Sequence, residues 1–163
     1  MAKPTETNLF QRGEFVLNSG ARSGWKLECD ALTDDDWEAL AYMIWQVVGQ
    51  FKTVEGVPRG GLKLADRLDQ YRCRDPRYPD QVVSGWDRLP HLIVDDVLTT
   101  GGSMMRLWQK HRDALPPGTM IEPGNWVIGA VVFARGLPPP WVTPLFQMPR
   151  ALWLPKAPGP DAG

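Results

Sequence analysis

Two adjacent carboxylates precede a loop of hydroxyl groups and glycines in the segment Val94–Ser103, VDDVLTTGGS. Carboxylates such as Asp95 and Asp96 accept hydrogen bonds from sugar hydroxyls, and their oxygens suit magnesium. The following loop offers backbone N–H groups at the start of a predicted helix, which favours phosphate binding, and glycine lets the backbone approach the phosphate closely. Together the two halves predict a site for a phosphorylated ribose, and the alternative is an ordinary strand-to-helix turn with an aspartate cap. The loop residues are Thr99, Thr100, Gly101, Gly102 and Ser103.

A second glycine-rich turn lies one strand-helix unit earlier, in Glu55–Gly61, EGVPRGG. Its guanidinium, Arg59, suits a pyrophosphate group, because arginine donates several hydrogen bonds from a planar fork. Pro58, Gly60 and Gly61 complete the turn. It is not a Walker loop, since no Gly-Lys-Ser/Thr follows at the required spacing. Taken by itself, the segment is equally compatible with a plain turn.

The elements that must position these loops alternate between strands and helices. Residues 53–57 and 91–95 are predicted strands, and the predicted helices 62–69 and 103–112 follow the two loops. Residues 126–133 form a third predicted strand. This order is typical of an α/β domain with a mainly parallel sheet flanked by helices, whose ligands bind beyond the carboxyl ends of the strands.

Helix caps and prolines delimit the rest of the chain. A helix is predicted over 34–48, with Thr33 as its cap and Gly49 at its end. A loop is predicted over 72–90, with a short extended piece at 81–83. Irregular chain is predicted over 137–144, before the apolar piece 145–146.

The segment Val94–Ser103 resembles the diphosphate-sugar signature of the type I phosphoribosyltransferases. The resemblance implies the fold of that family and 5-phosphoribosyl-1-diphosphate as a ligand. It implies that Asp95 and Asp96 meet the ribose hydroxyls and bind magnesium, directly or through water, while residues 99–103 hold the 5-phosphate. Glu55–Gly61 resembles the pyrophosphate loop of the same family.

The segment Gly13–Ser23 is similar to the opening of orotate phosphoribosyltransferases, where Gly-Glu-Phe and Leu-x-Ser-Gly form part of a hood over the base. The resemblance implies a small hood of about residues 1–30 with Ser19 as a substrate contact. It places Arg135 roughly where that family keeps an arginine for the orotate carboxylate, and an exposed surface arginine is the alternative. Thr99 replaces an aspartate of the 6-oxopurine enzymes, which favours a pyrimidine-like base.

The sequence also departs from the orotate enzymes. Asn18 replaces a lysine, and Lys26, a predicted base contact, stands with Leu27 where that family has an aromatic pair around the base. The expected mobile loop, 72–90, is atypical because it lacks a Lys/His-Gly cluster. In its place it offers Arg72, Arg74, Arg77 and Arg88.

The resemblance implies a transferase that moves the phosphoribosyl group from the sugar diphosphate to a nitrogenous base, orotate or another pyrimidine-like acceptor, with magnesium as cofactor. The atypical loop leaves open a non-catalytic sensor that binds the same sugar. A third alternative is a structural protein that binds other proteins, because the chain has eight tryptophans and large aromatic side chains also build interfaces. Because family members are commonly dimers, the resemblance also implies a homodimer.

The 163 residues fit one domain, predicted over 1–154 and followed by a disordered tail, 155–163. A formal charge of -1 argues against nucleic acid as a partner. No apolar run approaches the roughly 20 residues that cross a bilayer, so no membrane association and a cytoplasmic location are expected.

The two cysteines and two histidines show no metal-ligand spacing. Cys29 and Cys73 are predicted to be structural or incidental thiols in a reducing compartment. His91 is predicted to pack within its strand, and His111 to lie on the surface.

Overall fold

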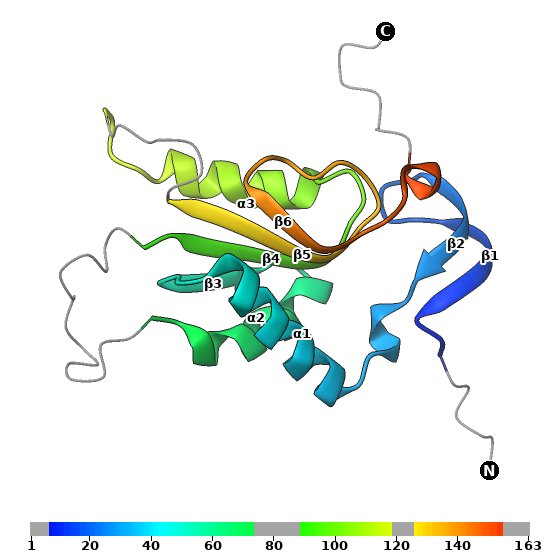
Figure 1. Cartoon of the computed structure of the whole chain (residues 1–163). Coiled ribbons are helices and arrows are strands. Elements are labelled where there is room, and N and C mark those ends of the chain that lie inside the picture. The colour runs from blue at the N-terminus through cyan, green and yellow to red at the C-terminus, as the bar shows by residue number, and fades with distance from the viewer. Residues whose placement is uncertain (1–6, 74–88, 119–125, 155–163) are drawn as a thin grey trace, which may run out of the picture.

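Figure 1 shows a four-stranded sheet with helices on both faces and a separate two-stranded hairpin beyond one end of the sheet. The computed structural model describes residues 7–73, 89–118 and 126–154. The predicted α/β class, with a parallel sheet flanked by helices and a small N-terminal hood, is confirmed. The strands are β1 Phe10–Val16, β2 Arg22–Leu27, β3 Thr53–Gly56, β4 His91–Leu98, β5 Val127–Ala134 and β6 Val142–Gln147, and the helices are α1 Asp34–Val48, α2 Gly60–Leu68 and α3 Gly102–Asp113.

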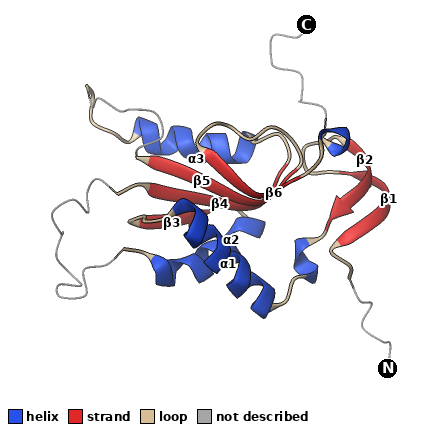
Figure 2. Cartoon of the chain, in the orientation of Figure 1, coloured by secondary structure: helices blue, strands red, loops and turns tan. Residues whose placement is uncertain are grey.

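The sheet has the order β3-β4-β5-β6, and each neighbouring pair is parallel. Helices α1 and α2 cover one face and α3 covers the other (Figure 2). Because all four strands run in the same direction, their carboxyl ends meet at one end of the sheet, the end nearest the hairpin (Figure 1). Ligands of such sheets bind at this end.

Helix α1 begins where the sequence predicts it. The Thr33 side chain accepts a hydrogen bond from the Asp36 N–H at 3.1 Å, and the Asp36 carboxylate accepts one from the Thr33 N–H at 2.8 Å, which makes a capping box. Three aspartates in the first turn suit the positive end of the helix dipole. The helix ends at Gly49, whose φ of 76° favours glycine.

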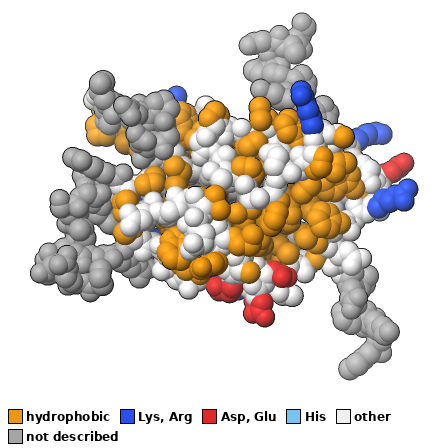
Figure 3. Space-filling model, viewed as in Figure 1, with side chains coloured by type: hydrophobic (Ala, Val, Ile, Leu, Met, Phe, Trp, Pro, Cys, Tyr) orange, Lys and Arg blue, Asp and Glu red, His pale blue; other side chains and the backbone are white. Residues whose placement is uncertain are grey.

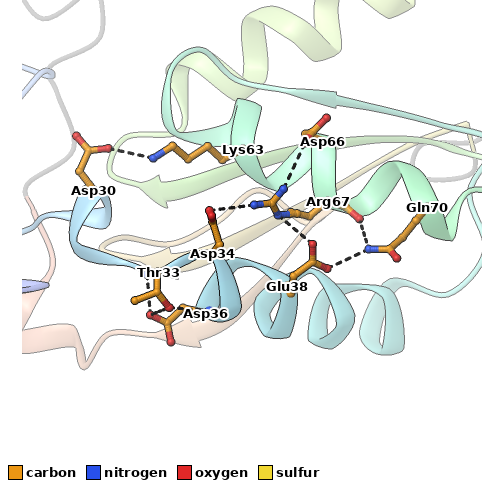
Figure 4. A network of polar contacts seen from close by, with 9 residues as sticks. All are labelled: Asp30, Thr33, Asp34, Asp36, Glu38, Lys63, Asp66, Arg67 and Gln70. Carbon is orange, nitrogen blue, oxygen red and sulfur yellow. Dashed lines mark hydrogen bonds and ion pairs between the residues drawn. The ribbon is translucent and has the colours of Figure 1, made fainter.

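Arg67 of α2 joins the two helices on this face of the sheet (Figure 4). Its Nη2 lies 3.0 Å from Asp34 Oδ1 and its Nε 3.0 Å from Glu38 Oε1, both on α1. Since both carboxylates are substantially exposed, solvent screens these ion pairs, and they orient α2 more than they stabilise the fold.

The core forms one layer on each face of the sheet. Trp37 and Ile44 of α1 pack beneath the sheet with Phe51, while three tryptophans surround the layer beneath α3. The ring of Trp108 lies 5.9 Å from Trp126 and 6.3 Å from Trp141, measured between centroids. Hydrophobic burial on both faces therefore supplies the main stabilisation of the sheet.

The hood is an antiparallel hairpin of β1 and β2, which pair from Phe10↔Leu27 to Val16↔Arg22. The sequence predicted the hood but not its strands. Phe10 and Phe146 both contact Phe133, with ring centroids 6.3 and 5.5 Å from its own, so β1 is packed against β5 beside the contact of β5 with β6. Figure 3 shows apolar side chains gathered on this side of the molecule.

The prediction of irregular chain over 137–144 is wrong in its last part, because β6 begins at Val142. Pro144 pairs with Val131 inside the ladder. The strand tolerates this proline because β6 is the outer strand of the sheet, where a missing N–H need not break an inner ladder. The preceding prolines, Pro138 to Pro140, form the connection that returns the chain alongside β5.

The other predicted elements exist, with boundaries shifted by a few residues. Strand β4 continues to Leu98, three residues beyond its predicted end, and α2 begins at Gly60 rather than at residue 62. The predicted extended piece at 81–83 and the predicted tail, 155–163, lie outside the described residues. None of the helices that the structure describes has the length and apolar character needed to span a bilayer.

Replacing Thr33 by alanine removes one hydrogen bond of the capping box. We expect the free energy of unfolding, measured by urea denaturation, to fall by about 1 kcal/mol. Thr33→Ser keeps the hydroxyl and should lose much less. Equal losses in the two variants would contradict a role for the hydroxyl as cap.

Candidate functional site

The two predicted loops meet at the carboxyl end of the sheet. The N–H of Val57, which follows β3, donates a 2.8 Å hydrogen bond to the carbonyl of Val94 in β4. A Cβ on Gly61 would lie 2.4 Å from the same carbonyl oxygen, and one on Gly60 would lie 2.1 Å from a carboxylate oxygen of Asp96. Position 61 therefore requires glycine, a side chain at position 60 would displace the Asp96 carboxylate, and the two loops share one contact surface.

The two aspartates point in different directions, because successive side chains of a strand face opposite sides of a sheet. Asp95 lines a hollow on the α3 side, whereas the Asp96 carboxylate lies against Gly60 at the start of α2. Asp95 Oδ1 accepts a hydrogen bond from the Asp96 N–H at 2.9 Å, and Asp96 Oδ1 accepts one from the Val97 N–H at 2.7 Å. These bonds fix the orientation of both carboxylates.

The electrostatics of the pair favour a cation or a hydrogen-bond donor. Burial and the negative charge of Asp96 raise the pKa of Asp95 to about 8. At neutral pH the pair therefore holds one proton. Magnesium can displace this proton, and a sugar hydroxyl can form a hydrogen bond with the pair. The Asp95 carboxylate, which lines the hollow, provides the hard oxygen ligands that magnesium prefers, so this residue fits that ion.

The loop before α3 has the features of a phosphate cradle. The hollow is lined by Asp95, Val97, Leu98, Met104 and the five predicted loop residues, Thr99 to Ser103. Gly101 adopts a φ of 79°, which favours glycine, and caps α3 without a side-chain hydrogen bond. Within the described residues, no group accepts a hydrogen bond from the backbone N–H of Thr100, Gly101, Gly102 or Ser103. These donors, at the positive end of a helix, are available to an anion.

The turn between β3 and α2 presents its guanidinium to solvent. Pro58 and Arg59 are exposed, and the peptide bond between them is cis. The Arg59 guanidinium forms no ion pair or hydrogen bond with the parts of the chain that the structure describes, and the Arg59 carbonyl accepts a hydrogen bond from the Leu62 N–H at 3.2 Å. Its charge is therefore available to an anionic ligand beside the carboxylates.

Arg135 follows β5 and lies at the junction of the sheet and the hood. Only 2% of it is exposed, so the alternative of an exposed surface arginine is wrong. Its guanidinium stacks on the Trp25 ring, 3.7 Å from the centroid, and its Nη2 donates to Ser23 Oγ at 2.8 Å. Nη1 donates to the Trp25 carbonyl at 3.3 Å, while Nε is buried without a hydrogen bond among the described residues. Burial lowers the pKa of this guanidinium.

The two predicted hood contacts do not lie in the hollow. Ser19 is exposed in the turn of the hairpin, and Lys26 forms a 2.8 Å ion pair with Glu28. Neither residue is among those that line the hollow. Of the arginines predicted to replace the mobile-loop cluster, Arg72 pairs with Asp69 at 2.8 Å, and Arg74, Arg77 and Arg88 lie outside the described residues.

Two site residues were not identified from the sequence. Cys29 lies against Asp96, and burial together with the nearby Asp96 carboxylate raises the pKa of its thiol. Trp25 provides the surface on which Arg135 stacks. A lone cysteine carries no sequence signal, whereas Trp25 could have been suspected, because it directly precedes Lys26 in the segment aligned with the base pocket.

Solved structures with this arrangement include orotate phosphoribosyltransferases. The enzyme from Aeropyrum pernix aligns with a TM-score of 0.60 and 23% identity over 86% of this chain and 88% of that chain. The chain has the type I phosphoribosyltransferase fold. The Mycobacterium tuberculosis orotate phosphoribosyltransferase, solved with Fe(III) dicitrate, aligns with a TM-score of 0.55 and 15% identity over 85% and 89% of the two chains.

The same phosphoribosyltransferase fold is found within a longer protein. Leishmania donovani UMP synthase aligns with a TM-score of 0.57 and 15% identity over 86% of this chain and 34% of that chain. No protein-family model and no curated protein sequence matches the chain.

The raised pKa of Asp95 predicts a pH dependence of stability. The folded protein holds this proton up to about pH 8, whereas the unfolded chain releases it near the ordinary value of 3.8, so ionisation of Asp95 lowers the stability as the pH rises between these values. Asp95→Asn removes the titration. We expect the free energy of unfolding of the variant, relative to wild type, to increase from pH 5 to pH 9 in urea denaturation.

The control for this comparison is Asp66→Asn, which neutralises an exposed carboxylate of α2. It should keep the wild-type pH profile. A constant difference between Asp95→Asn and wild type across this range would contradict the raised pKa.

Proposed function

We propose that the protein binds 5-phosphoribosyl-1-diphosphate with magnesium and transfers its phosphoribosyl group to a nitrogenous base. The observation that carries the proposal is the set of unoccupied N–H donors before α3, directly beside the Asp95 carboxylate in one hollow. A phosphate and a sugar hydroxyl on the same molecule satisfy both groups. The fold shared with phosphoribosyltransferases supports this ligand.

Each part of the site then has a role. The N–H groups of residues 100–103 and the hydroxyls of Thr99, Thr100 and Ser103 bind the 5-phosphate. Asp95 accepts hydrogen bonds from the ribose hydroxyls, and Asp96 supports it from the other side of β4. Arg59 binds the pyrophosphate and stabilises its charge as it departs.

Magnesium is held in this proposal by Asp95, directly or through water, while Asp96 faces the start of α2 and adds its negative charge from the other side of β4. When bound, the ion neutralises charge on the diphosphate of the substrate and on the carboxylate pair. The reaction breaks the bond between C1 of the ribose and the pyrophosphate oxygen, and a base nitrogen forms the new bond to C1. The protein contributes mainly by orienting the sugar and stabilising charge.

The acceptor that we propose is orotate or another pyrimidine-like base. Thr99 stands where the enzymes of 6-oxopurines carry an aspartate, so the acid that would act on a purine ring is missing. Arg135 provides a positive charge where β5 meets the hood, and the adjacent Trp25 provides an aromatic surface. A planar anionic base suits such a pair.

A sensor that binds the same sugar without turnover is a second candidate. Two of the Arg135 donor nitrogens are already engaged by Ser23 and by the Trp25 carbonyl, and Lys26 is engaged by Glu28. These contacts reduce the number of charged groups available to a base. In the described structure these contacts favour a sensor over a transferase.

Both the transferase and the sensor must bind the sugar diphosphate, so a binding measurement tests what the two candidate functions share. We expect wild-type protein to bind it with magnesium in isothermal titration calorimetry, and Asp95→Asn/Asp96→Asn to bind it at least about tenfold more weakly, because hydrogen bonds to charged groups are lost. Asp34→Asn/Asp35→Asn, which removes an adjacent exposed pair at the start of α1, is the matched control and should bind like wild type. Equal heats for wild type and the site variant would eliminate the proposed site.

Pyrophosphate release separates the transferase from the sensor. We expect release from wild-type protein with the sugar diphosphate, magnesium and orotate, less release with hypoxanthine, and none from Asp95→Asn/Asp96→Asn. A panel of further pyrimidines and purines identifies the acceptor. If wild type binds the sugar but releases no pyrophosphate with any base, the transferase is rejected in favour of the sensor.

A further inference from the structure

A second cluster of titratable side chains lies toward the amino end of β4, away from the two loops. Glu55 belongs to β3, His91 is the first residue of β4, and His111 lies in the last turns of α3. Figure 1 shows that the start of β4 and the end of α3 lie at the same end of the molecule, opposite the hairpin. None of the three side chains lines the hollow beside Asp95, so the cluster is separate from that hollow, although Glu55 opens the segment that leads to Arg59.

The three side chains converge on one point. Glu55 Oε2 lies 2.6 Å from His111 Nε2 and 3.4 Å from His91 Nε2, and one ligand atom from each residue lies within 4.8 Å of the others. In a tetrahedral zinc site with bonds of about 2.0–2.1 Å, neighbouring ligand atoms lie about 3.3 Å apart. The Glu55–His91 separation already fits this geometry, and the Glu55–His111 separation needs to open by roughly 0.7 Å.

Thr53 orients the imidazole of His91. Its Oγ1 lies 2.5 Å from His91 Nδ1, so Nδ1 is engaged and Nε2 faces Glu55 and His111. Nε2 is buried and has no hydrogen-bond partner among the described residues. In the tautomer in which Nδ1 donates to the Thr53 hydroxyl, the lone pair of Nε2 is directed toward Glu55 and His111 and can coordinate a cation between them.

The other oxygen of Glu55 has a separate partner. Lys110 Nζ lies 3.3 Å from Oε1, which leaves Oε2 to the two histidines. The Lys110 side chain is 66% exposed and can therefore move into solvent if a cation binds.

We propose that Glu55, His91 and His111 bind a divalent transition metal ion of the zinc type, with water as the fourth ligand. Two imidazoles and one carboxylate select such an ion over magnesium or calcium, which prefer oxygen ligands. Because the ligands come from β3, β4 and α3, the ion fastens the end of α3 to the sheet.

Cobalt(II) is the probe, since its visible absorbance reports tetrahedral coordination by nitrogen and oxygen. Full-length protein without a histidine tag should bind cobalt(II) at one saturable site per chain, and zinc(II) should displace it. Glu55→Gln and His111→Asn should each weaken cobalt(II) binding by about tenfold or more, because each removes one ligand. Zinc(II) should raise the melting temperature of wild type but not of His111→Asn.

Three control variants make the assignment specific. Asp113→Asn neutralises an exposed carboxylate at the end of the same helix, and Asp95→Asn/Asp96→Asn removes the other metal-binding candidate. Both should bind cobalt(II) like wild type, and Lys110→Gln should bind it at least as tightly. The far-ultraviolet circular dichroism of each variant shows whether it is folded. Absence of cobalt(II) binding by wild type, or equal affinity in folded His111→Asn and wild type, would overturn the proposal.

Discussion

The backbone of the turn between β3 and α2 lies directly against the end of β4, and the rest of the site depends on this contact. Side chains at Gly60 and Gly61 would collide with the Asp96 carboxylate and the Val94 carbonyl. With glycine at both positions, α2 starts next to the acidic pair, and Arg59 is carried to the same end of the sheet. Two segments about 35 residues apart in the sequence thereby form one surface.

The elements nearest the hollow could be predicted from the sequence because residues that are neighbours in the sequence determine each of them. The apolar run of β4, the two carboxylates and the glycines before α3 are consecutive, so the order of strand, loop and helix fixes their arrangement. The capping residues of α1 likewise identify its first turn from a few neighbouring positions. The fold class and the order of strand, loop and helix around the hollow were therefore accessible without coordinates.

Features that depend on distant contacts were not accessible in this way. Arg135 is 110 residues from Trp25, so nothing in its surroundings along the chain showed that it is buried. His111, predicted to lie on the surface, is half-buried beside Glu55, 56 residues away. Strand β6 was missed because prolines disfavour strands in general, whereas the outer position that tolerates Pro144 is a property of the whole sheet.

The position of Cys29 against Asp96 has a consequence for thiol chemistry. Only a thiolate attacks electrophiles such as iodoacetamide, and burial next to a carboxylate keeps the proton on this sulfur. Although Cys29 touches the acidic pair, it is thus a packing group rather than a nucleophile. Because the thiol is also buried, we expect alkylating reagents that label ordinary cysteines to leave this one unmodified in the folded protein, so that its labelling would report unfolding where the hood meets the core.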